Sequence, residues 1–139
     1  MTEKPTQYIV VFPDCPFCSE EVRSRIITSH GSVFALEDKY PVTPGHLLII
    51  PYRHTVDYFS LTEQERKHAE ELLLILQNRV RGDDDTVTGF NVGVNCGESA
   101  GQTVMHAHIH LIPRRDGDLK NPKGGVRGVI PEKMSYQDD

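Results

Sequence analysis

Residues 105–111 contain three histidines that alternate with apolar residues, in the order Met-His-Ala-His-Ile-His-Leu. Alternate side chains of a β-strand share one face, so His106, His108 and His110 are expected on one face, with neighbours about 6.5–7 Å apart. The residues expected to face a core are Met105, Ala107, Ile109 and Leu111. Imidazoles bind metals, attack electrophiles and move protons near neutral pH. The alternation therefore predicts a strand that carries a functional site.

The length and charge of the chain limit the classes of function. A chain of 139 residues is expected to form one domain. A net charge of −5, without a long basic block, argues against binding to polymeric nucleic acid. No apolar run approaches a membrane span, and the residues after Met1 lack the apolar core of a signal peptide, so a cytoplasmic protein is expected. Three cysteines in a reducing compartment favour metal binding or catalysis over disulfides.

The clearest helix begins after Thr62, which forms a predicted capping box with Glu65. Apolar residues recur at helical spacing along it: Ala69, Leu72, Leu73, Leu76 and Val80. The Gly-Asp-Asp-Asp stretch at 82–85 is expected to end it. A shorter helix is predicted over 19–27, with Ser19 as its N-cap.

Strands are predicted over 32–37, 46–51, 90–94 and the histidine run, with a further edge element over 8–12. The last two strands are joined by a short connection, which favours an antiparallel hairpin. The expected fold is α+β, an antiparallel β-sheet with one long helix packed on one face.

Cys15 and Cys18 form a Cys-x-x-Cys pair, which can hold one Zn²⁺ as half of a tetrahedral site. A structural zinc needs two further ligands, and the chain offers His54 and His106. A redox role is less favoured, because no strand–Cys-x-x-Cys–helix unit surrounds the pair. Cys96 is isolated and is expected to be a small buried hydrophobe.

A glycine-containing turn over 97–103 precedes the histidine run. Such a turn can direct backbone N–H groups at an anion, and Gln102 and Thr103 add an amide and a hydroxyl. Its position beside the histidines predicts a phosphate-binding site.

These segments together resemble the histidine triad (HIT) superfamily. Asn95, the Gly-Gln-Thr-Val segment at 101–104 and the His-Ala-His-Ile-His-Leu-Ile segment at 106–112 are similar to the family's signature, His-φ-His-φ-His-φ-φ with φ apolar. Segments 34–38 and 44–54 resemble the family's first half. The resemblance covers about residues 8–115 of a single HIT-like domain, 1–139, with 116–139 expected as an extended tail.

The resemblance implies a role for each matching residue. His108 would be the nucleophile that attacks an α-phosphorus and carries a nucleotidyl intermediate, with its other ring nitrogen held by an acceptor such as a backbone carbonyl. His110 would contact the phosphate and assist the leaving group, and His46 would complete a hydrogen-bond relay behind the nucleophile. Asp38 would bind the ribose. The residues implied to hold the phosphate are Asn95, Gly101, Gln102 and Thr103.

The two cysteines resemble those of the family's zinc-containing branch. In that branch a structural zinc is held by residues matching Cys15, Cys18, His54 and His106.

The implied activity is that of a nucleotide hydrolase or nucleotidyltransferase acting on dinucleoside polyphosphates or nucleoside phosphoramidates. Hydrolysis and phosphorolysis share one intermediate, so both agree with the sequence. Basic residues after the histidines could bind additional phosphates, which slightly favours polyphosphate substrates. These residues are Arg114, Arg115, Lys120, Lys123 and Arg127. The alternatives are a nucleotide-binding module with weak or no catalysis, and a zinc-binding structural protein.

The resemblance also implies a homodimer whose interface joins the two sheets and uses the long helix. The five consecutive residues 72–76 of that helix are apolar, so their side chains lie on all of its sides. Leu74 or Ile75 is therefore expected to face outward in a monomer. The alternative is that the tail, 116–139, covers them.

Overall fold

One antiparallel sheet forms the centre of the molecule. The computed structural model describes residue 12 and residues 14–136. In this part of the chain the strands are β1 (Thr28–His30), β2 (Val33–Glu37), β3 (Leu47–Pro51), β4 (Val87–Gly93) and β5 (Ile109–Arg115), in the order β1-β2-β3-β5-β4. The predicted α+β fold is confirmed, and β4 and β5 pair antiparallel as expected. The predicted edge element over 8–12 lies outside the described residues except for Phe12.

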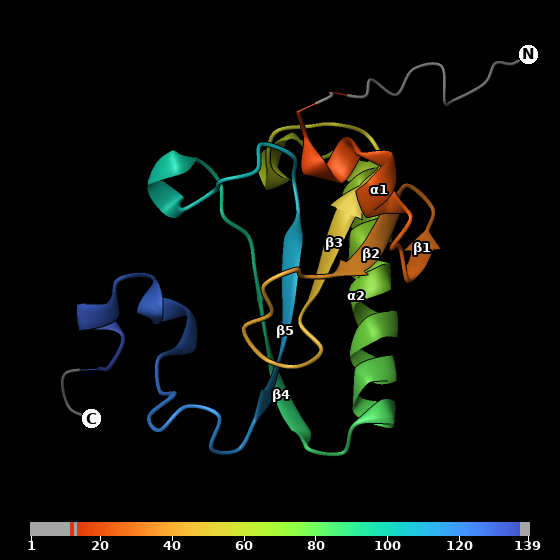
Figure 1. The fold of residues 1–139 in the computed structure, drawn as a ribbon. Coiled ribbons are helices and arrows are strands. Elements are labelled where there is room, and N and C mark those ends of the chain that lie inside the picture. The colour runs from red at the N-terminus through yellow and green to blue at the C-terminus, as the bar shows by residue number, and fades with distance from the viewer. Residues whose placement is uncertain (1–11, 13, 137–139) are drawn as a thin grey trace, which may run out of the picture.

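Helix α2 (Glu63–Asp83) lies against one face of the sheet, and Figure 1 shows it running alongside β2 and β3. The capping box predicted at its start is present: the Thr62 hydroxyl accepts from the Glu65 backbone, and the Glu65 carboxylate accepts from the Thr62 backbone. Ala69, Leu72 and Leu76 are buried against the sheet, as the helical spacing predicts. None of the helices in the described part of the chain combines the length and hydrophobicity that crossing a membrane requires.

The opposite face of the sheet is covered by the N-terminal segment. Phe34, Leu36, Leu48 and Ile50 form a second buried cluster with Val22 of helix α1 (Glu20–Arg23). Ser19 caps α1 as predicted, but the helix has only one turn and residues 28–30 form the unpredicted strand β1. The β-branched pair Ile26 and Ile27 precedes β1, and such residues favour extended backbone.

Strand β5 begins at Ile109, three residues later than the histidine alternation predicts. Pro51 ends the neighbouring strand β3 and has no N–H with which to extend the ladder. Its carbonyl instead accepts a hydrogen bond from the side chain of His106. Ala107, Ile109 and Leu111 are buried as expected, whereas Met105 is 41% exposed, so the prediction that it enters the core is wrong.

The tail turns back on itself, whereas a mostly extended course was expected. It contains two short 3₁₀ helices, Gly125–Val129 and Pro131–Lys133. In Figure 1 the tail (blue) lies to the left of β4, while α2 lies to the right of β5. Leu74 and Ile75 are 60% and 41% exposed, so the described part of the tail does not cover them.

Candidate active site and metal centre

A cleft of about 570 Å³ opens between the N-terminal segment, the start of β5 and the loop after β2. It gathers residues from distant parts of the chain. The predicted site residues that line it are Asp38, Asn95, Gly101, Thr103, His108 and His110. His46 contacts this group from behind, while His106, His54 and the two cysteines form a separate cluster nearby.

One ring nitrogen of His108, Nδ1, is held by a hydrogen bond to the backbone. Its Nδ1 lies 2.8 Å from the backbone carbonyl oxygen of His106. A carbonyl only accepts, so Nδ1 carries a hydrogen, and in the neutral ring Nε2 then keeps its lone pair. This is the tautomer that a histidine nucleophile requires.

Behind the cleft, a chain of hydrogen bonds fixes the tautomers of two more histidines. The backbone N–H of Val42 donates to Nδ1 of His46 at 3.0 Å, so the hydrogen of His46 is on Nε2. That nitrogen lies 2.9 Å from Nδ1 of His110, which must therefore accept. The remaining hydrogen of His110 is on Nε2. The relay thus leaves Nε2 of His110 as a hydrogen-bond donor, and His110 lines the cleft.

Burial lowers the pKa of His110 to about 4, and the neighbouring His108 and His46 act in the same direction, against the carboxylate of Asp38. Burial also lowers the pKa of His46, again opposed by Asp38. Both rings are therefore neutral near pH 7, which agrees with the hydrogen-bond pattern.

Asp38, the predicted ribose ligand, lies between the cleft and this relay. Its Oδ1 accepts from the backbone N–H of Tyr40 at 2.8 Å. Its Oδ2 is 3.4 Å from Nε2 of His46 and 3.9 Å from Nδ1 of His110. The carboxylate therefore acts electrostatically on the two histidines while it lines the cleft.

The turn before the histidines is stabilised by hydrogen bonds between its own backbone groups. The N–H groups of Ala100, Gly101 and Gln102 all donate within the turn, so they are not available to an anion. The Gln102 side chain, predicted to hold phosphate, is buried and bonds to Val56 O, Val104 O and Gly97 N. Gln102 therefore fixes the loop, while Thr103 lines the cleft.

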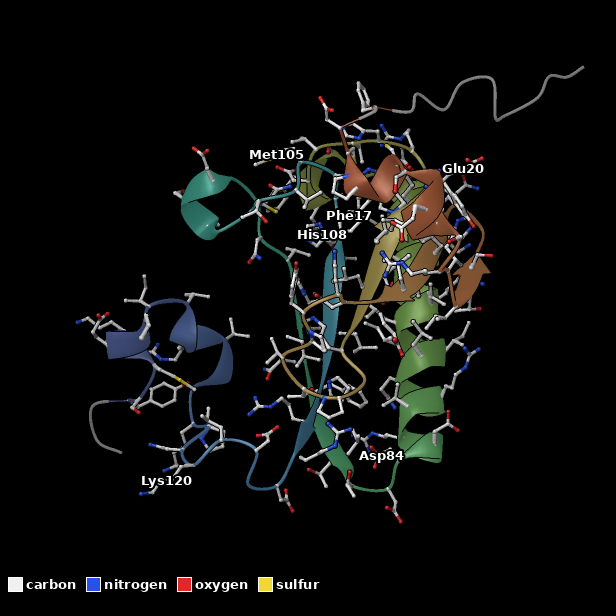
Figure 2. All side chains as sticks on the ribbon, viewed as in Figure 1. Phe17, Glu20, Asp84, Met105, His108 and Lys120 are labelled. Carbon is white, nitrogen blue, oxygen red and sulfur yellow. The ribbon has the colours of Figure 1, made fainter. Side chains whose placement is uncertain are left out.

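One end of the cleft is apolar, which was not predicted from the sequence. The ring of Phe17 packs edge-on against His108, with 5.1 Å between centroids, and Figure 2 shows the two side by side. The other apolar residues at this end are Pro16, Val22, Leu36 and Leu48. The available signal was the position of Phe17 between the two cysteines. An apolar wall beside polar groups is typical of sites for small organic ligands.

The two cysteines and two histidines predicted to bind metal meet in one place. The ligand atoms of Cys15, Cys18, His54 and His106 all lie within 4.8 Å of one another. The sulfur–nitrogen distances are 3.3 Å for Cys15–His106, 3.4 Å for Cys18–His54 and 3.6 Å for Cys18–His106. Tetrahedral zinc with bonds of about 2.3 Å to sulfur and 2.0–2.1 Å to nitrogen separates such ligands by about 3.6 Å. The donor set and its spacing fit zinc.

Contacts around the cluster fix the tautomer of His106 and the position of the cysteine turn. Nε2 of His106 donates to the Pro51 carbonyl at 2.9 Å, which leaves Nδ1 unprotonated toward the sulfurs. Burial lowers the pKa of His106 to about 4, so the ring is neutral. Arg23 fixes the cysteine turn to the sheet through the carbonyls of Phe17 and Tyr52.

The basic residues after the histidine run do not reach the cleft. Arg114 pairs with Asp118 and Asn91, Arg115 pairs with Asp84, and Arg127 donates to carbonyls of the tail. Neither Lys120 nor Lys123 is among the residues that line the cleft, and Figure 2 shows Lys120 far from His108. In the described part of the chain these cations therefore give no support for a preference for polyphosphates.

Known proteins are similar to this chain in sequence and in fold. The profile of the HIT domain matches residues 19–117. The chain is 36% identical over 129 residues to the AP-4-A phosphorylase of Mycobacterium tuberculosis, covering 88% of this chain and 63% of that protein. It therefore spans less than two thirds of that relative. It is also 36% identical over 103 residues to the bis(5'-adenosyl)-triphosphatase of Dictyostelium discoideum, covering 71% of this chain and 66% of that protein.

A solved zinc-bound structure has the same fold as this chain. The zinc-bound histidine triad family protein from Mycobacterium smegmatis superposes with a TM-score of 0.63 at 31% identity, over 69% of each chain.

Proposed function

The chain belongs to the HIT family, and from that premise we propose that it is an enzyme that cleaves dinucleoside polyphosphates at the α-phosphate through a covalent intermediate on His108. The observation that carries the proposal is the hydrogen bond from Nδ1 of His108 to the carbonyl of His106, which places the lone pair of the neutral ring on Nε2 in a residue that lines the cleft. The names of the two enzymes similar to this chain support the substrate class.

In the first step, Nε2 of His108 attacks the α-phosphorus. A phosphorus–nitrogen bond forms while the bond to the bridging oxygen breaks, and that oxygen keeps the electron pair. The leaving polyphosphate departs as an anion and needs no proton to do so. The Nε2 hydrogen of His110 stabilises the negative charge on the reacting phosphate by a hydrogen bond. His46 holds His110 in the required tautomer.

In the second step, a water molecule attacks the same phosphorus and the phosphorus–nitrogen bond breaks. The electron pair returns to Nε2 of His108, a proton of the water passes to solvent, and a nucleoside monophosphate is released. Inorganic phosphate in place of water gives a nucleoside diphosphate. The similar relatives include one phosphorylase and one triphosphatase by name, so both nucleophiles agree with the family.

The nucleotide is bound along the length of the cleft. We assign the α-phosphate to the side chains of Asn95 and Thr103, which line the cleft together with His108. The Asp38 carboxylate can accept the ribose hydroxyls at the next position. The base then occupies the apolar end, against Phe17.

We assign one structural zinc to Cys15, Cys18, His54 and His106. When bound, the metal cross-links the N-terminal turn to the segment that precedes β5. It thereby fixes the backbone of His106, whose carbonyl orients His108.

We propose a two-fold dimer through α2 and the edge strand β4. Leu74 and Ile75 are exposed on α2, and Val92 of β4 is 48% exposed. In the described part of the chain β4 lies at an edge of the sheet, and an edge strand together with an apolar helix face favours a second copy as partner.

The test is to trap the intermediate. The protein is mixed with diadenosine tetraphosphate, quenched within milliseconds to seconds and measured by intact mass, in parallel with His108→Asn. We expect a mass increase of one adenylyl group in the parent and none in the variant. Product analysis with and without inorganic phosphate then identifies the second nucleophile. Turnover that persists in His108→Asn would contradict the mechanism, and binding without turnover would favour a nucleotide-binding module.

A further inference from the structure

A second cleft, of about 410 Å³, adjoins the catalytic cleft on the side of the tail. The two clefts share Asn95 and His110, so they meet at the position assigned to the reacting phosphate. One wall of the second cleft comes from β4 and β5. The other wall comes from the tail segment 125–129 and from Val42 of the loop that bonds to His46.

The tail that forms this wall is a folded element. Gly124 has φ of 91°, and a Cβ there would overlap the carbonyl oxygen of Met134. Arg127 donates to the carbonyls of Lys133 and Met134 and lies over the ring of Tyr136. These contacts close residues 124–136 into a loop that presents Val126 and Val129, which are 64% and 76% exposed.

The lining of the second cleft indicates what it binds. The apolar residues that line it on the loop before β3, on the tail and on the face of the sheet that carries His110 are Val42, Ile112, Val126 and Val129. Among the residues that line it in the described chain, none is a lysine or an arginine. A phosphate would find no cation there, whereas a flat uncharged group would bury apolar surface on both sides. The volume lies within the range of about 300–1,000 Å³ that small-molecule sites occupy.

We infer that the second cleft is the subsite for the nucleoside of the leaving group, so that the enzyme binds both halves of a dinucleoside polyphosphate. This inference rests on the proposed function. One nucleoside binds against Phe17 with its α-phosphate at His108. The polyphosphate crosses His110 and Asn95, and the second nucleoside binds between β4 and the valines of the tail. The tail thus selects dinucleotides over nucleotides with a small leaving group.

Matched variants of the tail test this subsite. Val126→Asn and Val129→Asn change exposed residues that line the second cleft. Ile130→Asn is the control, because Ile130 is the next residue, is also exposed and is not part of the lining. The substrates are diadenosine tetraphosphate, which has a second nucleoside, and adenosine 5'-phosphoramidate, whose leaving group is ammonia.

We expect each valine variant, and more so the double variant, to raise KM for diadenosine tetraphosphate by about tenfold, which corresponds to one lost apolar contact. Kinetics on the phosphoramidate should change less than twofold, and Ile130→Asn should match the parent on both substrates. Equal effects on both substrates, or none on either, would overturn the subsite. If the His108→Asn variant retained the activity of the parent, that result would instead contradict the proposed function.

Two further measurements keep the outcomes distinct. Equilibrium binding compares His108→Asn with the double variant His108→Asn/Val129→Asn. The double variant should have a lower affinity for diadenosine tetraphosphate and the same affinity for AMP. This measurement does not depend on turnover. Light scattering should give the same mass for the parent and the valine variants. A lower mass in the valine variants would assign the cleft to a second copy of the chain and overturn the nucleoside subsite.

Discussion

The Nδ1 atom of His108 and the backbone carbonyl oxygen of His106 are joined by a hydrogen bond of 2.8 Å. The side chain of His106 points the other way, into the cluster with Cys15 and Cys18. A single short segment therefore connects the proposed zinc site to the proposed nucleophile. Loss of the metal ligands should affect both stability and the orientation of His108.

Replacing Cys15 with Ser should remove most of the zinc and lower the melting temperature by roughly 10 °C or more, because the binding free energy of a structural metal is part of the folding free energy. The parent should contain about one zinc per chain by elemental analysis. Cys96→Ser is the control and should keep zinc and melting temperature, since Cys96 lies outside the cluster. A parent protein prepared without chelator that contains less than a few tenths of an equivalent would contradict the zinc assignment.

His108→Asn should lower kcat by about a thousandfold or more, because it removes the attacking nitrogen, while nucleotide binding stays within a few fold. His110→Asn should slow the reaction less, because it removes a hydrogen bond to the reacting phosphate but leaves the nucleophile. Steady-state kinetics on diadenosine tetraphosphate, with binding measured by calorimetry, separates the two. His30→Asn, which changes a histidine paired with Glu71 away from the cleft, should leave kcat unaltered.

Gln102 and Thr103 are adjacent but should respond differently to substitution. Gln102→Leu removes the side-chain hydrogen bonds to Val56, Val104 and Gly97, so it should cost roughly 2–3 kcal/mol of stability and also raise KM. Thr103→Ala should raise KM with little change in melting temperature, because Thr103 lines the cleft. Thermal unfolding and initial rates on the same samples are the measurements. Equal melting temperatures for the two variants would argue against the structural role of Gln102.

Stability should fall as the pH is lowered from about 6.5 toward 4. The folded pKa of His110 is about 4, below its usual value near 6.5, because burial disfavours the charged ring. In this window the unfolded state binds more protons than the folded state, so acidification favours unfolding. His110 should contribute roughly 2–3 kcal/mol to the loss.

Urea unfolding at pH 7 and pH 4.5 measures this contribution, and His110→Gln should show a smaller decrease than the parent. The proposed zinc ligands are the same in both proteins, so the difference between them isolates His110. Identical decreases in the two proteins would show that His110 is not responsible.

A dimer should be visible in solution as about twice the chain mass of 15.7 kDa. Leu74→Glu or Ile75→Glu should yield monomers or insoluble protein, because a charge would be buried at a two-fold contact. Both residues are exposed in the single chain, so the substitution should not disturb the core of one subunit. Light scattering at micromolar concentration is the measurement, and a parent mass near that of one chain would contradict the dimer.

The sequence by itself determined the local elements and the identity of the candidate residues. The capping box at Thr62 and the spacing of Ala69, Leu72 and Leu76 predicted α2, because helix start and buried face depend on residues within a few positions of one another. The Cys-x-x-Cys spacing and the alternating histidines likewise indicated candidate metal-binding and nucleophilic groups. The resemblance to the family then supplied their expected partners.

Tertiary structure alone decided which way the side chains face and which nitrogen carries each hydrogen. The tautomer of His110 depends on His46, 64 residues earlier, and that of His46 on the backbone of Val42. His106 faces the cysteines because Pro51 ends β3 and offers a carbonyl to its ring. Gln102 is internal for a similar reason, since its carbonyl partners come from Val56 and Val104. The contacts of His46 with His110, of His106 with Pro51 and of Gln102 with Val56 join segments far apart in the chain, so no local pattern specifies them. They exist only once the strands have paired and the loops have packed.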